Sequence, residues 1–226
     1  MQTYITPLGF DTSHIVSLIV RHGIKNGDEI LLLRSNGEDK RATNAVFEIK
    51  QILDKIDQTI IIKEIIVDHT QYRSMVLQFM ELIIAASPPK RPSGTVHVNL
   101  SGGPREILVA LVTASLALRE RVLFCSGYSD VKREQMPIDL PFLQSFPDKM
   151  SISALKVIHE NPGISFIDIA QQLQTSESTV SRTCARMENN HIIEIKSEGK
   201  SKFAHLSFTG EIILRKYLST VDDYEY

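Results

Sequence analysis

The 226-residue sequence has few cysteines and almost no net charge. Its two cysteines lie in apolar surroundings, Cys125 in a strand-like run and Cys184 in a helical one. We therefore expect both to be buried thiols of an intracellular protein rather than parts of a disulfide framework. The formal net charge of −2 indicates nothing about the sign of a partner's charge.

Long apolar runs, targeting signals and metal-ligand spacings are also missing. No apolar run is long enough to span a bilayer, and no basic start followed by an apolar stretch and a cleavage site marks a signal peptide. The seven histidines are scattered, and none pairs with Cys, Asp or Glu at the spacing of metal ligands. His97 lies inside a strand and is expected to be a core or strand-face residue. The sequence predicts a cytoplasmic protein without membrane span, metal or cofactor.

Residues 96–106 combine an apolar strand, a Ser-Gly-Gly turn and the start of a long apolar helix. Gly102 and Gly103 let the backbone approach a ligand without a Cβ in the way, and Pro104 suits the first helical position. The free N–H groups of that helical turn attract an anion, and Arg105 adds donors that suit phosphate. This pattern predicts a phosphate cradle or, alternatively, a tight turn between buried elements. Both the Gly-Lys-Ser/Thr ending of a nucleotide-triphosphate loop and the glycine spacing of a dinucleotide fingerprint are missing.

Strands and helices alternate over the first 140 residues. Strands are predicted at 2–8, 29–33, 59–67, 96–100, 121–126 and 134–140. Helices are predicted at 14–21, 42–56, 72–86 and 104–118. Asp11 or Thr12 is expected to cap the first helix, which Gly23 ends. Near-continuous apolar strands separated by amphipathic helices predict an α/β fold with a mostly parallel sheet covered on both faces.

Ligands of such sheets bind beyond the carboxyl ends of the strands, at the switch point. The turns expected at this edge are 9–13, 34–37, 68–73, 101–105 and 126–130. Their hydroxyls, amides, glycines and arginines suit a polar ligand that carries phosphate. Ser35 and Asn36 are placed near the ligand by this geometry alone. Asp68 and His69 form either an acid/base pair or a helix cap with a solvated neighbour.

The last third of the chain has a different pattern. Pro137, Pro141 and Pro147 predict a linker at 137–150 between a first domain at 1–136 and a second at 151–226. Helices are expected in the second domain at 152–158, 166–173, 177–189 and 210–218, with hairpin strands at 192–196 and 202–208. Ser165 and Thr209 are expected to cap the second and last of these helices. Helix, helix, turn, helix and hairpin is the order of a winged helix-turn-helix domain, a smaller α+β module.

The run from Ile169 to Arg182, Ile-Ala-x-x-Leu-x-x-Ser-x-Ser-Thr-Val-Ser-Arg, resembles the helix-turn-helix of bacterial and archaeal transcription regulators. In that motif the third helix enters the major groove of DNA. The candidate DNA-binding residues are Ser176, Glu177, Ser178, Thr179, Ser181, Arg182 and Arg186 at this helix, with Lys200 and Lys202 on the hairpin. From residue 148 onward acids and bases are about equal, so protein docking is the alternative function. Because a near-neutral monomer binds DNA weakly, we predict a dimer that engages two half-sites.

The segments Pro7–His14 (Pro-Leu-Gly-Phe-Asp-Thr-Ser-His) and Asn99–Arg105 (Asn-Leu-Ser-Gly-Gly-Pro-Arg), together with the winged helix, resemble the CARF family. More closely, they resemble archaeal CRISPR-associated transcriptional regulators that fuse a CARF domain to a winged helix-turn-helix. The resemblance covers essentially the whole chain. It implies a Rossmann-like sheet, a two-fold homodimer and a cyclic oligoadenylate bound across the dimer axis. It also implies binding to double-stranded DNA at CRISPR leaders or at promoters of CRISPR-associated genes.

The resemblance also assigns ligand-binding residues. They are Gly9, Phe10, Asp11, Thr12, Ser13, Asn99, Leu100, Ser101, Gly102, Gly103, Pro104 and Arg105. A ring tetranucleotide matches an isologous interface because each subunit grips an equivalent half, which favours cyclic tetra-adenylate over the hexamer. Some CARF proteins cut their own ligand, but no dedicated base is evident here. We therefore predict a ligand-gated DNA-binding dimer that is not an enzyme; the alternatives are a ring nuclease and a nucleotide-binding scaffold of a CRISPR complex.

Overall fold

The computed structural model describes residues 1–37, 39–56, 59–87, 95–140, 147–199 and 201–221. The chain divides into two compact units, Met1–Leu143 and Gln144–Tyr226. The predicted boundary at 136 falls inside the last strand of the first unit, and the first helix of the second unit begins at Lys149. Both ends of the linker predicted at 137–150 therefore belong to regular elements.

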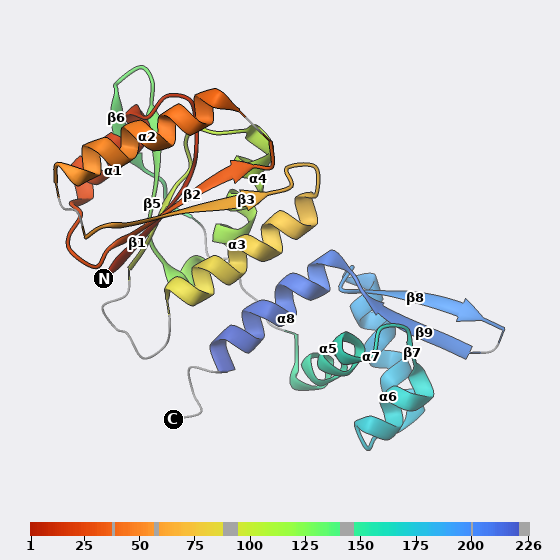
Figure 1. The fold of residues 1–226 in the computed structure, drawn as a ribbon. Coiled ribbons are helices and arrows are strands. Elements are labelled where there is room, and N and C mark those ends of the chain that lie inside the picture. Colours follow the sequence, from red (N-terminus) through yellow and green to blue (C-terminus); the bar gives the residue numbers. More distant parts are fainter. Residues whose placement is uncertain (38, 57–58, 88–94, 141–146, 200, 222–226) are drawn as a thin grey trace. The chain divides into compact units, whose positions relative to one another are not determined.

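A six-stranded sheet with the strand order β3-β2-β1-β4-β5-β6 forms the first unit (Figure 1). Its strands are β1 Gln2–Pro7, β2 Glu29–Ser35, β3 Ile61–Val67, β4 Thr95–Asn99, β5 Val122–Ser129 and β6 Glu134–Pro137. Its helices are α1 Ser13–His22, α2 Lys40–Asp54, α3 Tyr72–Ala86, α4 Arg105–Ala117 and the short 3-10 helix Arg119–Arg121. All neighbouring strands pair in parallel except β6, which is antiparallel to β5. The predicted α/β class with a mostly parallel sheet is confirmed.

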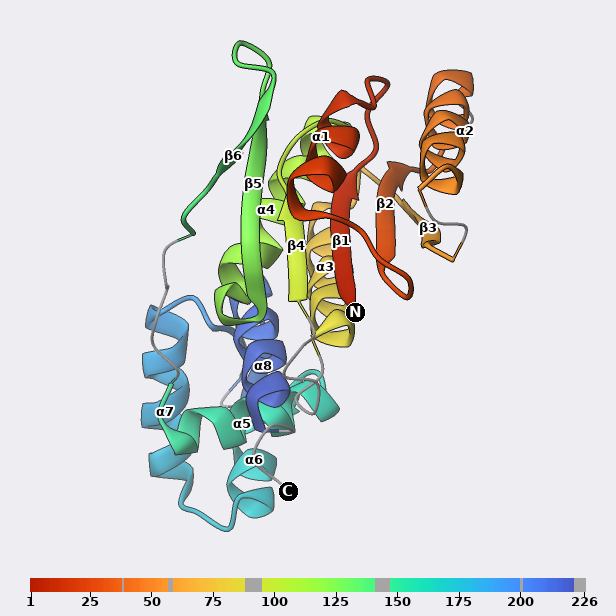
Figure 2. The same cartoon turned by 90° about the vertical axis from the view of Figure 1, so that its left-hand side faces the viewer.

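Helices cover both faces of this sheet, α1 and α2 on one side and α3 and α4 on the other (Figures 1 and 2). The consecutive residues Leu31 and Leu32 of β2 are 4% and 0% exposed, although they point to opposite faces. Tyr4, Ile30 and Leu32 pack with apolar residues of α1 and α2 in one core cluster. Burial on both faces explains why the strands are apolar without alternation.

The switch point lies between β1 and β4. Ile5 of β1 pairs with Leu31 of β2 on one side and with Val98 of β4 on the other. From β1 the chain proceeds outward to β2 and β3, whereas from β4 it proceeds in the opposite direction to β5. The turns that follow β1 and β4 therefore emerge side by side at the carboxyl edge.

Two strands are longer than predicted. Arg34 and Ser35, which were expected in a turn, belong to β2, where Ser35 pairs with Val67. Likewise β5 continues through Ser129, because Ser126 to Ser129 pair with β6. Backbone pairing does not depend on an apolar side chain, so each strand continues beyond the last residue of its apolar run.

The N-terminal caps of α1 and α4 differ from prediction. Pro104 is the N-cap of α4, with φ −62° and ψ 141°, instead of its first helical residue. Thr12 is the N-cap of α1 but makes no side-chain capping bond. The Asp11 carboxylate instead accepts a hydrogen bond from the Ser13 amide at 2.8 Å. At the other end of α1, Gly23 has φ +73° and ends the helix as predicted.

The second unit has the winged helix order. Its elements are α5 Lys149–Glu160, β7 Ile164–Ser165, α6 Phe166–Gln172, α7 Glu177–Asn189, β8 Ile193–Glu198, β9 Ser201–Leu206 and α8 Phe208–Val221. The strands form an antiparallel sheet of order β7-β9-β8. The two-residue strand β7 is the element that the sequence did not predict. The α7 bounds agree with the prediction.

Two helix caps in this unit were predicted. Ser165 caps α6, since its hydroxyl accepts from the Asp168 amide at 3.1 Å, which confirms that prediction. Thr209 does not cap α8, because the helix begins at Phe208. Ser207 takes the capping position, where its hydroxyl accepts from the Gly210 amide at 3.1 Å.

Both cysteines are buried and free, as predicted. Burial raises the pKa of Cys125 to about 12 and that of Cys184 to about 11. Neither thiol therefore forms the reactive thiolate at neutral pH.

Membrane-spanning helices and clusters of metal ligands are both absent from the described residues. None of the helices has the length and apolar character that crossing a membrane requires. No group of three or more His, Cys, Asp or Glu side chains in this part of the chain is arranged to hold a metal ion.

Candidate functional site

The turns after β1 and β4 touch through their backbones. A Cβ added to Gly9 would lie 3.0 Å from the amide nitrogen of Gly103 and 3.4 Å from Cα of Gly102. Gly102 and Gly103 have φ values of +76° and +68°, which glycine adopts without steric cost. A Cβ on Gly103 would also lie 2.7 Å from Cβ of Pro7. The close approach of neighbouring atoms thus explains why all three positions are glycine.

Two cavities adjoin this contact, and both are lined by Gly9, Phe10 and Gly103. The larger has a volume of about 490 Å³; its other lining residues are Asp11, His14, Leu100, Ser101, Gly102, Tyr128 and Asp130. The smaller has a volume of about 270 Å³; its other lining residues are Leu8, Arg34, Ser35, Gly37, Asp39, Ala42 and Pro104. Both cavities therefore lie at the switch point, the edge at which the sequence predicts a ligand to bind.

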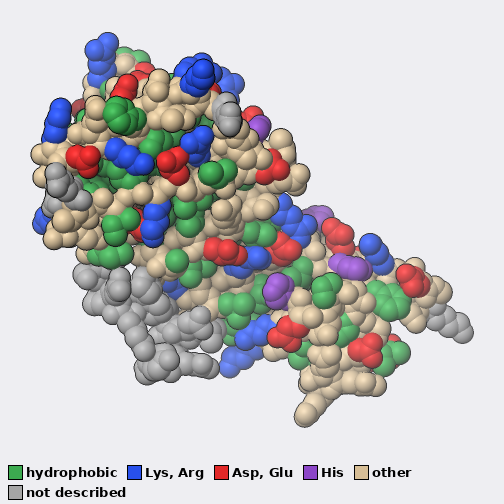
Figure 3. Space-filling view, in the orientation of Figure 1, with side chains coloured by type: hydrophobic (Ala, Val, Ile, Leu, Met, Phe, Trp, Pro, Cys, Tyr) green, Lys and Arg blue, Asp and Glu red, His purple; other side chains and the backbone are tan. Residues whose placement is uncertain are grey.

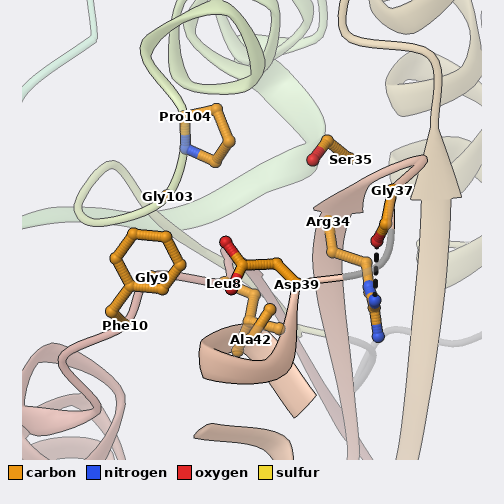
Figure 4. A pocket seen from close by; sticks show the side chains of 10 residues that line it. All are labelled: Leu8, Gly9, Phe10, Arg34, Ser35, Gly37, Asp39, Ala42, Gly103 and Pro104. Carbon is orange, nitrogen blue, oxygen red and sulfur yellow. Dashed lines mark hydrogen bonds between the residues drawn. The ribbon is translucent and has the colours of Figure 1, made fainter.

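In the smaller cavity an aromatic ring and an acidic side chain border the opening (Figure 4). Phe10 is 55% exposed, and the guanidinium carbon of Arg41 lies 3.9 Å from its ring centroid. Arg34 points away from the middle of the cavity, because its guanidinium donates to Glu64 at 2.8 Å and to the Gly37 carbonyl at 3.3 Å. An exposed aromatic ring provides a surface on which a nucleobase can stack.

The larger cavity contains both donors and acceptors. The Ser101 hydroxyl accepts from the Tyr128 amide, so its own proton remains available to a ligand. The carboxylate of Asp11 accepts from Ser13, and this hydrogen bond lowers the pKa of Asp11 and keeps it ionised. Asp130 adds a second carboxylate. Carboxylates accept from ribose hydroxyls and exocyclic amines, so the cavity suits a whole nucleotide better than a bare phosphate.

His14 lines the larger cavity but is not among the predicted ligand residues. The other lining residues outside that prediction are Leu8, Arg34, Gly37, Asp39, Ala42, Tyr128 and Asp130. His14 is 4% exposed, and its Nδ1 lies 2.9 Å from Nδ2 of Asn99. Burial lowers the pKa of His14 to about 4, so the ring is neutral near pH 7. One sequence signal could have identified it, since it directly follows the turn 9–13 in the first turn of α1.

Not every predicted ligand residue reaches a cavity. Nine of them line one, namely Gly9, Phe10, Asp11, Ser35, Leu100, Ser101, Gly102, Gly103 and Pro104. Thr12, Ser13, Asn36, Asn99 and Arg105 line neither. Asn99 is fully buried behind the site, and Arg105 is exposed as the first residue of α4.

The third turn lies apart from the site. β3 is separated from β1 by β2. The Asp68 carboxylate accepts from the Thr70 amide at 3.0 Å and from its hydroxyl at 2.7 Å. This local turn favours the structural alternative for Asp68 over an acid/base pair.

A second buried histidine lies in the core, away from the cavities. His97 is 4% exposed and neither of its ring nitrogens has a hydrogen-bond partner in the described structure. Its ring stacks on Tyr4 at 4.9 Å and lies 4.9 Å from the ring of His22. Burial, aided by His22, lowers the pKa of His97 from 6.5 to about 4.

We expect the His97→Phe variant to lose less stability in acid than the original protein. In the unfolded chain His97 has its ordinary pKa of 6.5, whereas in the folded protein its pKa is about 4. The unfolded chain therefore binds a proton between these pH values that the folded protein does not bind. The contribution of neutral His97 to the free energy of unfolding is therefore fully present above pH 6.5. It falls by about 2–3 kcal/mol as the pH drops to 4. Urea unfolding followed by circular dichroism at pH 7 and 4.5 measures the difference. Equal acid sensitivity of both proteins would contradict this assignment.

The candidate nucleic-acid interface is the exposed side of α7. Ser176 is its N-cap and accepts from the Thr179 amide at 3.2 Å. Ser178 and Arg182 are exposed and Ser181 is half-buried on one face, while Val180, Cys184 and Met187 are buried on the other. Glu177 is exposed in the first turn. This face therefore presents hydroxyls and the Arg182 guanidinium to solvent, and Arg186, one turn further along, is also exposed.

The two arginines of α7 lie in different surroundings. Arg182 donates within its own helix, to the Ser178 carbonyl at 3.3 Å. Arg186 instead forms an ion pair with Asp148 and donates to the Ser151 hydroxyl at 3.0 Å, which joins α7 to the first turn of α5. Its guanidinium thus has structural partners that Arg182 lacks.

The hairpin and the surface charge complete this interface. Lys202 lies on β9, with Nζ 6.0 Å from the ring centroid of Phe166; Lys200 lies outside the described residues. On the face shown in Figure 3, positive and negative side chains of the second unit are interspersed. This face therefore offers no broad basic surface for DNA.

Comparison with known proteins identifies both units. Residues 2–127 match the family described as the Csa3 CRISPR-associated Rossmann-like domain, and residues 147–194 match the winged helix-turn-helix DNA-binding family. Together these matches define a CRISPR-associated, DNA-binding regulator. Since the first match covers more than half of the sequence, the chain belongs to the Csa3 CRISPR-associated family. No curated protein gives a significant match.

Solved structures resemble part of the chain. PcaV of Streptomyces coelicolor, bound to its natural ligand, is 12% identical over 34% of this chain and 58% of its own, with a TM-score of 0.32. MepR of S. aureus in its complex with DNA is 22% identical over 35% of this chain and 60% of its own, with a TM-score of 0.33. AF1382 of Archaeoglobus fulgidus is 21% identical over 36% of this chain and 92% of its own, with a TM-score of 0.33. The chain thus spans under two thirds of the first two proteins, and such local likeness carries no conclusion about function.

Proposed function

We propose that this protein is a cytoplasmic, homodimeric transcriptional regulator that binds a cyclic oligoadenylate between its first units and double-stranded DNA through its winged helices. The backbone contact of Gly9 with Gly102 and Gly103, between two cavities at the switch point, carries this proposal. It provides amide N–H groups at the N-terminus of α4, where a phosphate is favoured. The DNA is proposed to be a CRISPR leader or a promoter of CRISPR-associated genes.

A ring ligand suits this arrangement. Each subunit offers a nucleotide-sized cavity with a stacking ring, Phe10, and carboxylates for ribose hydroxyls. A two-fold pair of such sites matches the two equivalent halves of a cyclic tetra-adenylate. We therefore favour the tetra-adenylate over the hexa-adenylate as the regulatory ligand.

Ligand binding is proposed to change DNA affinity without cutting the ligand. The ring can shift the dimer between two arrangements only through unequal affinity for them, typically by about 1–3 kcal/mol. The Asn99 amide lies 2.9 Å from Nδ1 of His14, which places the proton of the neutral ring on Nε2, so this residue provides no base at the larger cavity. Incubation of the pure protein with labelled cyclic tetra-adenylate tests this point, since rapid linear products would identify a ring nuclease instead.

We expect the Arg105→Ala variant to bind cyclic tetra-adenylate about tenfold or more weakly. Arg105 is exposed at the first residue of α4, beside the glycine turn, and its planar guanidinium suits a phosphate oxygen. Isothermal titration calorimetry measures the affinity. Lys55→Ala is the control. It removes one exposed positive charge from the C-terminal end of α2, whereas the N-terminal end of that helix borders the smaller cavity. Absence of heat with every adenylate ring, in the original protein, would refute the ligand-binding proposal.

A further inference from the structure

One polar atom at the larger cavity is buried without a partner. Nε2 of His14 has neither a hydrogen bond nor contact with solvent, although the ring lines the cavity. An unsatisfied buried donor or acceptor costs about 1–3 kcal/mol, so such atoms are rare in folded proteins. The position of Nε2 therefore needs an explanation beyond packing.

The neighbours of His14 decide which ring nitrogen carries the proton. Nδ2 of Asn99 donates to the Thr6 hydroxyl at 3.0 Å and lies 2.9 Å from Nδ1 of His14. The Thr6 hydroxyl in turn donates to the Pro7 carbonyl at 3.3 Å. Because an amide nitrogen can only donate, Nδ1 accepts and the proton of the neutral ring lies on Nε2. The atom without a partner is thus an N–H donor.

Two glycines lie beside this donor. A Cβ on Gly102 would lie 2.2 Å from Nε2, and a Cβ on Gly9 would lie 3.4 Å from it. The N–H group therefore lies between the two backbone turns, close to the starts of α1 and α4. Both helix N-termini favour a negatively charged ligand atom at this point.

Other groups hold the ring in place or tune its charge. Gln135 of β6 donates from Nε2 to the His14 carbonyl at 2.6 Å. Asp11 and Asp130 favour the charged ring, but the effect of burial is larger and lowers the pKa of His14 to about 4. The donor therefore adds no charge to the cavity above that pH.

We propose that the Nε2–H group of His14, oriented by Asn99, donates a hydrogen bond to a phosphodiester oxygen of the bound oligoadenylate. This inference rests on the proposed function and names a binding residue within its site. The Gly9 and Gly102 turns touch over this donor, so they must move apart for the ligand to reach it. His14 acts as a neutral donor, not as a base that would activate a 2′-hydroxyl.

The test compares the full-length variants His14→Phe, His14→Gln and His97→Phe by calorimetry at pH 7.5. The probes are cyclic tetra-adenylate and the linear dinucleotide ApA, which carries one phosphodiester. We expect His14→Phe to bind about 10- to 100-fold more weakly, because a hydrogen bond to a charged group is lost. His14→Gln, which retains an amide donor, should recover most of this affinity. His97→Phe, the same change at a buried histidine outside the cavities, should bind as the original protein does.

A second measurement does not depend on the variants folding. Nitrogen-15 NMR of the imidazole should show His14 protonated on Nε2 in the free protein and a slowly exchanging Nε2 proton after a probe is added. Unchanged affinity of His14→Phe for the ring, or a proton on Nδ1, would overturn the proposal while the ring-binding function stands. Suppose instead that the protein binds ApA in a way that depends on His14 but binds no ring. This result would refute the proposed binding of a cyclic oligoadenylate and support the role of His14 as a donor to a phosphodiester. Binding of neither probe by the original protein would refute both.

Discussion

Gly102→Ala is expected to abolish binding of cyclic tetra-adenylate, whereas Gly27→Ala is expected to preserve it. Both glycines have a positive φ, +76° at Gly102 and +84° at Gly27, so both alanine variants carry a backbone cost of about 1–2 kcal/mol. Only at Gly102 would the new Cβ meet another group, 2.2 Å from Nε2 of His14. No atom lies within 4 Å of the Cβ position at Gly27.

The collision at Gly102 involves a ring that cannot simply rotate away, because Asn99 holds it from the other side. The turn or the ring must move, which adds about 1–3 kcal/mol of overpacking. We therefore expect Gly102→Ala to lower the free energy of unfolding by about 3 kcal/mol and Gly27→Ala by about 1 kcal/mol. Urea unfolding and calorimetry measure the two effects. Normal ring binding by a folded Gly102→Ala variant would show that the glycine turn is not part of the site.

Arg182→Ala is expected to weaken DNA binding by at least 30-fold. Arg182 is exposed on α7, and an arginine that contacts a base in the major groove contributes about 1–3 kcal/mol. A dimer would lose two such contacts, so the loss of binding free energy doubles. Fluorescence anisotropy with a CRISPR leader duplex measures the affinity, and calorimetry with the ring should give an unchanged value.

A matched control is Arg215→Ala, which removes the same charge from α8. Salt titrations then distinguish two roles for Arg182. Loss of a phosphate contact would reduce the salt slope by about 1 per contact, whereas loss of a base contact would relax the sequence preference. DNA binding that is unchanged by Arg182→Ala would favour the protein-docking function of the winged helix.

The sequence predicted those features that depend on local patterns. The α/β alternation, the bounds of α3 and α7, and the meeting of the turns after β1 and β4 all follow from apolar periodicity and the rules for parallel sheets. The Ser-Gly-Gly turn could be identified from the sequence because the backbone conformation at both positions requires glycine. Both φ values are positive there, and both glycines touch the turn at Gly9.

Features that depend on tertiary contacts were missed. The catalogue of ligand residues omitted His14, because only the folded chain brings Asn99, 85 residues away, to its Nδ1. The extension of β2 through Ser35 depends on pairing with β3 and not on its own residues. Similarly, Arg182 and Arg186 were both predicted to bind DNA, whereas the fold places Asp148, 38 residues away, beside Arg186 alone.

That last pairing makes Asp148 serve two helices of the second unit. Its carboxylate caps α5 by accepting from the Ser151 amide, and it also pairs with Arg186 of α7. Loss of this one carboxylate would therefore remove the cap of α5 and the counter-charge of Arg186 at once.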